Sequence, residues 1–222
     1  HADAVRLARA AGLRNAATVE FLVEPATGAH WFIECNPRIQ VEHTITEAVT
    51  GVDLVEAQFR IAAGETLSAL GLDPASGPPE PRGFAVQLRV VALGAGTFTA
   101  YREPSGAGVR VDAAGYLGYS PPPQFDPLFA KLICRSGSSG DFVSAVDRAQ
   151  RALQAFHLAG VPDNRAQLAS ILAHPRFRAG DARTPWLATL ETPAGSLTSS
   201  VGTFLTQQSA HLGMSAPESA AP

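Results

Sequence analysis

The pattern of hydrophobic and polar positions along the chain predicts short strands and helices that alternate in two successive regions. Apolar and polar residues alternate at 19–23 and 31–35, and the segment EPATGAH at 24–30 is rich in turn formers, so we expect a hairpin there. Further strands are expected at 84–93, 96–102 and 108–112. Apolar positions at three- and four-residue spacing predict helices at 2–12, 46–63, 141–156 and 165–173.

The run FIECNPRIQVEH at 32–43 carries the most chemistry in the chain. Glu34, Asn36 and Arg38 occupy every second position, so in an extended chain their side chains would point the same way. Glu42 adds a second acid within nine residues. A half-solvated edge strand with polar residues outward is the alternative, but an acid, an amide, an arginine and another acid so close together favour a functional site.

The hairpin register brings another acid to this run. If the turn is centred on Thr27, Glu20 lies opposite Glu34, and two carboxylates facing each other across strands repel. A bridging divalent cation would reverse that repulsion, and Mg²⁺ or Mn²⁺ prefers hard oxygen ligands. Glu20, Glu34 and Asn36 are therefore expected to form a metal–phosphate platform. A slip of one residue would instead put the two acids on opposite faces.

These residues together resemble the ATP-grasp region of biotin carboxylase, a domain of the acetyl-CoA, propionyl-CoA, pyruvate and urea carboxylases. The resemblance rests on Glu20-Phe21, the run at 32–43, and the segment TEAVTGVDL at 46–54, and it extends over roughly 4–67. The shorter pattern Glu-x-Asn-x-Arg is shared by other ATP-grasp ligases such as carbamoyl-phosphate synthetase. The added IQVEH singles out biotin carboxylase.

The resemblance implies an enzyme that makes carboxyphosphate from bicarbonate and ATP and transfers CO₂ to the ureido nitrogen of biotin. Glu20, Glu34 and Asn36 match the family's metal ligands for Mg²⁺ or Mn²⁺. Arg38 matches the residue that binds bicarbonate, which suits a planar guanidinium fork, and Glu42 matches the base that takes the bicarbonate proton.

The resemblance also assigns cofactor-binding positions. These are Leu22, Ile33, Val41 and Arg89. The backbone at Val41 would assist bicarbonate binding, and Arg89 matches a catalytic arginine that stabilises the enolate-like biotin. Read without the resemblance, Arg89 is an exposed strand cation.

The resemblance implies an α+β fold with a mainly antiparallel sheet in its second part. We expect the C-terminal portion of an ATP-grasp domain at 1–72, a linker at 73–82, a biotin carboxylase C-terminal domain at 83–190, and an Ala/Ser/Pro-rich linker or tail at 191–222. The family's N-terminal half would lie upstream of this sequence. His43, Glu47 and Asp53 are expected to be structural, with the helix at 46–63 capped by Thr44 or Thr46.

One departure from the family keeps two alternatives open. After Arg89 the family continues with an asparagine and an acid and often a longer insertion, whereas this chain reads VVALGAG at 90–96. The shortened segment is the best evidence for a degenerate, non-catalytic module. Another ATP-grasp ligase that joins a carboxylate to an amine is the second alternative.

Composition narrows the setting. The 222 residues are 45% hydrophobic and 17% charged with a net charge of −3, so no basic patch predicts nucleic-acid binding and no apolar run predicts a membrane span. Cys35 and Cys134 lie far apart, which favours a reducing cytoplasm, and Cys35 is expected to pack as a small hydrophobe.

The partners follow from the resemblance alone. It implies a biotin carboxyl carrier domain, a carboxyltransferase domain or subunit, and a possible homo-oligomer. It does not identify the final acceptor of the carboxyl group, which is chosen by the carboxyltransferase.

Overall fold

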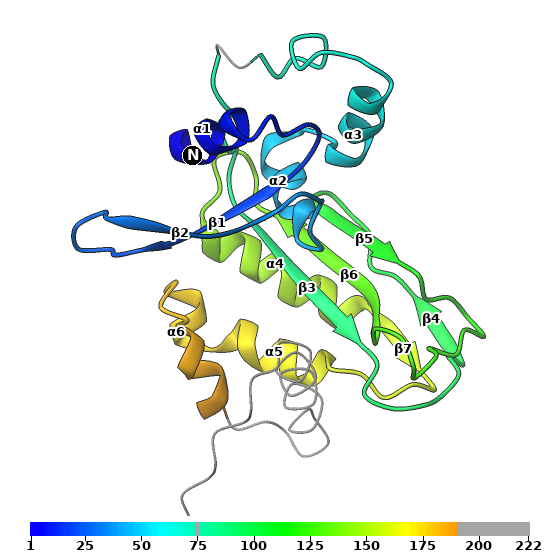
Figure 1. Ribbon diagram of the computed structural model, residues 1–222. Helices are drawn as coiled ribbons and strands as arrows, with labels where there is room; N and C mark the ends of the chain where they lie inside the picture. Colours follow the sequence, from blue (N-terminus) through cyan, green and yellow to red (C-terminus); the bar gives the residue numbers. More distant parts are fainter. Residues whose placement is uncertain (74–75, 191–222) are drawn as a thin grey trace, which may run out of the picture. The chain divides into compact units, whose positions relative to one another are not determined.

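The computed structural model describes residues 1–73 and 76–190 (Figure 1). The chain divides into two compact units, His1–Ala85 and Val86–Pro222. Each unit mixes helices with antiparallel strand pairs, which confirms the predicted α+β class. The tail predicted at 191–222 lies outside the described residues.

The first unit is a hairpin accompanied by three helices. Its elements are α1 (Ala2–Ala10), β1 (Thr18–Val23), β2 (His30–Asn36), α2 (His43–Thr50) and α3 (Leu54–Ala62). β1 and β2 pair antiparallel around the turn that contains Thr27 and Gly28, and Glu20 lies opposite Glu34. The predicted register of the hairpin is therefore confirmed.

The single helix predicted at 46–63 is wrong, because the chain forms two helices there. Gly51 ends α2 in the left-handed conformation with a φ of 77°, which a residue without Cβ adopts at little cost. Asp53 then caps α3 by accepting a hydrogen bond from the Glu56 N–H. Neither Thr44 nor Thr46 caps α2, whose N-cap position is occupied by Glu42.

The hairpin of the first unit keeps most of its side chains exposed. Trp31 and Leu22 are 55% and 62% exposed. Cys35 is also exposed, so the prediction that it packs as a small hydrophobe is wrong. The physical reason is that among the residues described in this unit only Thr44, Glu47 and Ala57 are buried, so no apolar layer covers the Cys35 side of the hairpin.

The second unit is built on a three-stranded sheet of order β3-β6-β5. Its elements are β3 (Ala85–Val91), β4 (Ala100–Arg102), β5 (Val109–Ala113), β6 (Leu128–Arg135), α4 (Phe142–Ala155), β7 (His157–Ala159), α5 (Arg165–Ala173), α6 (Pro175–Arg178) and a 3₁₀ helix (Thr184–Thr189). β5 pairs antiparallel with β6, and β4 pairs antiparallel with β7. The helices predicted at 141–156 and 165–173 are confirmed, whereas β7, α6 and the 3₁₀ helix were not predicted.

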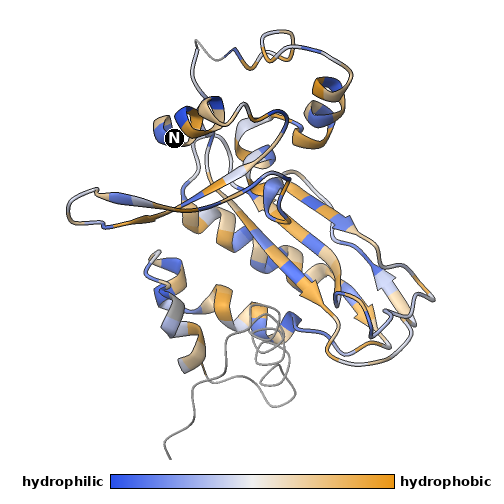
Figure 2. Ribbon diagram, in the orientation of Figure 1, coloured by the Kyte–Doolittle hydropathy of each residue, from blue (hydrophilic) through white to orange (hydrophobic). Residues whose placement is uncertain are grey.

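Helix α4 packs on one face of this sheet, as Figure 1 shows. Its buried residues recur at helical spacing and meet Val86 and Leu88 of β3 and Leu132 of β6 in one core cluster. Figure 2 shows the matching pattern along the three strands, where hydrophobic positions are interrupted by polar ones. Val86, Leu88 and Val90 are buried and Arg89 is exposed, so β3 turns Arg89 away from α4.

A second core cluster gathers aromatic residues at the β4–β7 end of the unit. Phe98, Phe129 and Phe156 are almost fully buried, and Phe98 meets both Phe129 and Tyr101 edge-on. The two clusters give this unit a continuous packed interior. None of the helices among the described residues reaches both the length and the apolar character that a membrane crossing requires.

Candidate functional site

The two opposed carboxylates at the base of the hairpin share one amide. Asn36 Nδ2 donates to Glu34 Oε1 at 2.7 Å and to Glu20 Oε1 at 3.4 Å. The amide hydrogens thus offset the repulsion between the acids. The structure brings together the three residues that the sequence predicts as metal ligands.

A bulge next to these residues changes the alternation along the hairpin. Glu20 pairs with Glu34, but Phe21 pairs with Phe32, so Ile33 is the extra residue of β2. Phe32 and Glu34 therefore do not follow the strict two-residue period that the sequence pattern suggested. The residues after Ile33 still alternate, which is why Glu34 and Asn36 reach each other.

Arg38 lies in the turn that follows β2 and not in the strand itself. β2 ends at Asn36, and the Arg38 N–H donates to the Asn36 carbonyl at 2.8 Å. The guanidinium then donates back to the Ile39 carbonyl at 3.2 Å. The prediction that an extended chain aligns Arg38 with Glu34 and Asn36 is wrong, because Pro37 and Arg38 bend away from the strand.

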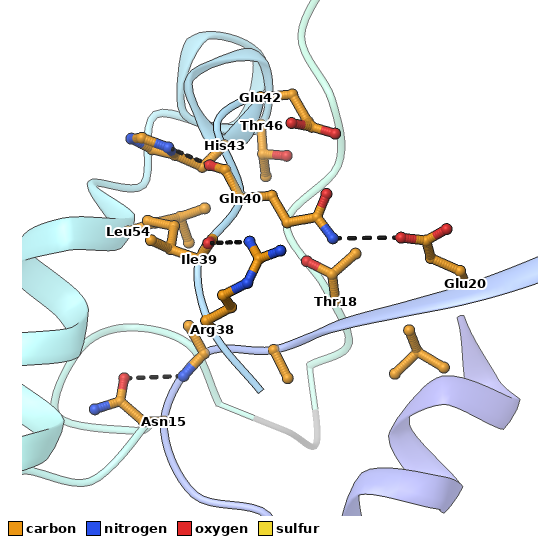
Figure 3. A pocket seen from close by; sticks show the side chains of 13 residues that line it. Asn15, Thr18, Glu20, Arg38, Ile39, Gln40, Glu42, His43, Thr46 and Leu54 are labelled. Carbon is orange, nitrogen blue, oxygen red and sulfur yellow. Dashed lines mark hydrogen bonds between the residues drawn. The ribbon is translucent and has the colours of Figure 1, made fainter. Parts of the chain in front are cut away.

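An open pocket of about 770 Å³ lies beside this turn (Figure 3). Of the predicted site residues, Glu20, Arg38 and Glu42 line it. Gln40 joins the two sides of the pocket, because its Nε2 donates to Glu20 Oε1 at 3.3 Å. Gln40 was not predicted as a site residue, and the available signal was its place between Arg38 and Glu42 in the same run.

The turn that carries Gln40 is fixed to the helices behind it. His43 Nδ1 lies 2.7 Å from the Gln40 carbonyl oxygen. His43 Nε2 lies 4.0 Å from Oε1 of the buried Glu47, and that oxygen accepts the Leu54 N–H at 2.8 Å. His43 and Glu47 therefore have structural contacts of the kind expected, and they connect the turn to α2 and to the start of α3.

Four predicted cofactor-binding positions lie outside the lining of this pocket. Leu22 and Ile33 are more than half exposed along the hairpin. Val41 is exposed in the turn between Gln40 and Glu42. Arg89 lies on β3 in the second unit.

The opposite end of the hairpin carries a separate ionic contact. His30 Nε2 lies 2.6 Å from Asp3 Oδ2 of α1. The hydrogen bond to Asp3 raises the pKa of His30, and the same bond, together with the nearby Arg6, lowers the pKa of Asp3. This contact ties α1 to the hairpin and lies outside the pocket lining.

The donor set at the base of the hairpin fits a hard divalent cation. Glu20 and Glu34 offer carboxylate oxygens, and turning the Asn36 amide about its terminal torsion would present Oδ1 in place of its NH₂ group. Among the described residues there is no cluster of three or more His, Cys, Asp or Glu side chains suited to a metal, so the third protein ligand would have to be an amide. A cation held by these three residues would have coordination positions left for water or for oxygens of a ligand such as a nucleotide phosphate.

Comparison with known proteins matches each of the two units to a protein family. Residues 1–70 match the family described as "Carbamoyl-phosphate synthase L chain, ATP binding domain", and residues 89–189 match "Biotin carboxylase C-terminal domain". The two matches follow each other along the chain in the order that the sequence resemblance predicts. Together they indicate a biotin carboxylase domain as the class.

Individual relatives agree with that class. Pyruvate carboxylase of Aspergillus terreus is 42% identical over 194 residues, which cover 83% of this chain and 16% of the relative. The solved biotin carboxylase domain of a single-chain bacterial carboxylase is 41% identical with a TM-score of 0.77, covering 94% of this chain and 46% of that one. The biotin carboxylase domain of Hydrogenobacter thermophilus 2-oxoglutarate carboxylase, solved with MgADP and bicarbonate, is 35% identical with a TM-score of 0.75, covering 84% and 41%.

The chain belongs to the biotin carboxylase family. It spans about a sixth of the length of the pyruvate carboxylases it matches and less than half of the solved biotin carboxylase domains.

Proposed function

We propose that this chain supplies three sets of residues to a biotin carboxylase: those that bind the cation, those that bind bicarbonate and the one that stabilises activated biotin. In the complete protein that carries this sequence, bicarbonate and ATP would give carboxyphosphate, and CO₂ would pass to the ureido nitrogen of biotin. The observation that carries the proposal is the connected group Glu34–Asn36–Glu20–Gln40, which leads directly into the turn holding Arg38 and Glu42.

The cation would sit between Glu20 and Glu34, with Asn36 as the third ligand. It would neutralise charge on the nucleotide phosphates during phosphoryl transfer. The protein's own contribution is to hold two acids 14 positions apart in sequence at directly opposed places in a hairpin. The Asn36 amide hydrogens now offset the repulsion between the two acids, and a cation would take over that part when the amide turns its oxygen toward it. The donor chemistry supports Mg²⁺ and would also admit Mn²⁺.

Bicarbonate would bind where Arg38 and Glu42 line the pocket. The Arg38 guanidinium offers a planar pair of donors to a planar anion, and backbone in the turn at Val41 would add to it. Glu42 would take the bicarbonate proton as a bicarbonate oxygen attacks the γ-phosphorus of ATP and the bond to ADP breaks. The Hydrogenobacter relative, whose solved domain holds MgADP and bicarbonate together, supports this assignment.

Biotin would be activated at Arg89. The ureido nitrogen has to lose its proton before it can attack CO₂, and the negative charge that develops on the ureido oxygen favours a nearby cation. Arg89 is exposed on β3 of the second unit, so biotin could approach it there. Leu22 and Ile33 are the proposed apolar contacts for the nucleotide.

The wider protein would include the partners that this chemistry requires. Biotin reacts while attached to a carboxyl carrier domain, and a carboxyltransferase domain or subunit would pass the carboxyl group to its final acceptor. The named relatives act on different acceptors, since they include pyruvate and 2-oxoglutarate carboxylases.

The test is ADP release by the complete protein that carries this sequence. We expect release to depend on bicarbonate and Mg²⁺ and to rise when free biotin is added. A folded protein that releases no ADP under these conditions would contradict the proposal and favour the degenerate module. Release that depends on an amine and not on biotin would favour the other ATP-grasp chemistry.

A further inference from the structure

The strand that carries Arg89 is held by one asparagine from far along the chain. Asn164 Nδ2 donates to the Arg89 carbonyl at 3.0 Å, and Asn164 Oδ1 accepts the Val91 N–H at 2.9 Å. Asn164 is only 5% exposed, and both polar ends of its side-chain amide are paired with β3. The amide therefore imitates a neighbouring strand at the residues on either side of Val90.

The residues just before Asn164 continue this pairing past the end of β3. Asp163 forms an isolated antiparallel bridge with Ala92, and the Leu93 N–H donates to the Pro162 carbonyl at 2.8 Å. The other edge of β3 faces β6, where the Ala92 N–H donates to the Pro127 carbonyl at 2.9 Å. Residues 162–164 thus seal the edge of β3 that no strand of its sheet covers.

The loop that carries Asn164 is itself rigidly held. Asp163 Oδ1 accepts hydrogen bonds from the backbone N–H and the Nε of Arg165, at 2.9 and 2.8 Å. The Arg165 guanidinium also donates to the carbonyl of Phe156, the C-cap residue of α4, and to the carbonyl of Leu158 in β7. The Asn164 carbonyl accepts the Leu168 N–H in the first turn of α5. The loop is therefore fixed to three neighbouring elements.

We propose that Asn164 is a positioning residue for Arg89, an inference that rests on the proposed role of Arg89 at biotin. Arg89 comes directly before the shortened segment at 90–96, where a free strand end would let the backbone of Arg89 shift. Asn164 pairs with β3 on both sides of Val90 and thereby fixes the point from which the guanidinium projects. A displacement of the backbone by a fraction of an ångström there would move the charge away from the ureido oxygen.

The test separates two reactions of the complete protein. Asn164→Asp keeps the shape and the acceptor for the Val91 N–H, but it sets a carboxylate oxygen against the Arg89 carbonyl in place of a donor. We expect kcat/KM for biotin-stimulated ADP release to fall about tenfold or more. Bicarbonate-dependent ADP release without biotin, which uses the first unit, should stay within about twofold of the unsubstituted protein.

A matched control distinguishes the loss of the Asn164 hydrogen bonds from a general loss of stability in the second unit. Val146→Ala deletes buried side-chain volume from α4 in the same unit without touching the contacts of β3 with residues 162–164. It should leave both reactions near the unsubstituted level at a temperature where each variant is folded. If Asn164→Asp does not fold, Asn164→Ser carries the same test with a smaller and uncharged side chain.

The outcomes are distinct. A selective loss of biotin stimulation in the Asn164 variant supports the inference. A parallel loss of both reactions, no loss at all, or the same selective loss in Val146→Ala overturns it while leaving the proposed function in place. An unsubstituted protein with no biotin stimulation would instead remove the proposed function, and the inference with it.

Discussion

The first and second units hold their candidate site residues by different means. In the second unit, Arg89 projects from a strand whose alternate residues are buried beneath α4. In the first unit, Glu20, Arg38 and Glu42 lie on a hairpin and turn with hardly any buried apolar residues among those described. Packing beneath α4 and the two backbone hydrogen bonds of Asn164 hold the strand of Arg89, whereas the acids of the first unit are held chiefly by hydrogen bonds between polar side chains. A site of the second kind can rearrange when a ligand replaces one of those bonds.

The largest effect is expected from a substitution that removes the proposed base of the first unit and leaves the second unit unchanged. Glu42→Gln removes the proposed base and keeps the side chain's size, so bicarbonate-dependent ADP release by the complete protein should fall by about a hundredfold or more. Glu24→Gln, an exposed acid in the turn of the same hairpin, is the matched control and should change turnover little. Full activity of the Glu42 variant would show that it is not the base.

The next largest effect is expected on stability, and it tests whether buried packing contributes more in the second unit than in the first. Leu132 is completely buried in the second unit, so Leu132→Ala should lower the free energy of unfolding by about 2–5 kcal/mol. Leu22→Ala, on the exposed hairpin, should change it by only about 0.5 kcal/mol or less. Each unit contains one of the two tryptophans of this chain, so Trp31 in a Trp186→Phe background reports the denaturant unfolding of the first unit, and Trp186 in a Trp31→Phe background reports that of the second. Equal losses in the two variants would contradict the comparison.

The two cysteines, one in each unit, give a smaller and simpler contrast. Cys134 is buried in the core, and burial raises the pKa of its thiol to about 11. Cys35 is exposed on β2. Iodoacetamide at pH 8 should alkylate Cys35 in the native 222-residue chain and reach Cys134 only on unfolding, as peptide mass mapping would record. Fast native labelling of Cys134 would mean that the second unit opens readily.

The smallest expected effect concerns the Asp3–His30 contact at the far end of the hairpin. The pKa of His30 is raised above 6.5, so its contribution to stability is complete below that value and is lost as the pH rises through the folded pKa. The pKa of Asp3 is lowered below 3.8, so its contribution is present above that value and is lost as the pH falls through the folded pKa. The contact should therefore stabilise the unit most between these two values.

An NMR titration of the His30 ring checks this contact. Asp3→Asn should lower the His30 pKa, because it removes the charged acceptor of the hydrogen bond. The same His30 titration curve in both proteins would show that Asp3 and His30 do not interact in solution.

The sequence predicted local features better than those that depend on distant contacts. The opposition of Glu20 and Glu34 followed from the position of the turn between two short strands, and the structure confirms it. The bulge at Ile33 and the bend after Pro37 did not follow, because a two-residue period describes only an unbroken strand. The single helix predicted at 46–63 was wrong because the hydrophobic spacing continues across Gly51, whereas Gly51 adopts the left-handed conformation and ends α2.

Other features lay beyond any local pattern. The exposure of Cys35 depends on which elements cover the hairpin, and alternation along a strand does not provide that information. Asn164 contacts Arg89 across 75 positions, so only the folded chain connects the loop at 162–164 with the shortened segment after Arg89. The roles predicted for all of the site residues, including Leu22, Ile33 and Val41, stay predictions.

The most direct measurement is the Mg²⁺ dependence of ADP release by the complete protein and its Glu34→Gln variant. If Glu20, Glu34 and Asn36 hold the cation, the variant should need about tenfold or more Mg²⁺ for half-maximal rate, while its apparent affinity for biotin changes far less. An unchanged Mg²⁺ requirement with a weakened response to biotin would contradict the assignment of the cation site to the base of the hairpin.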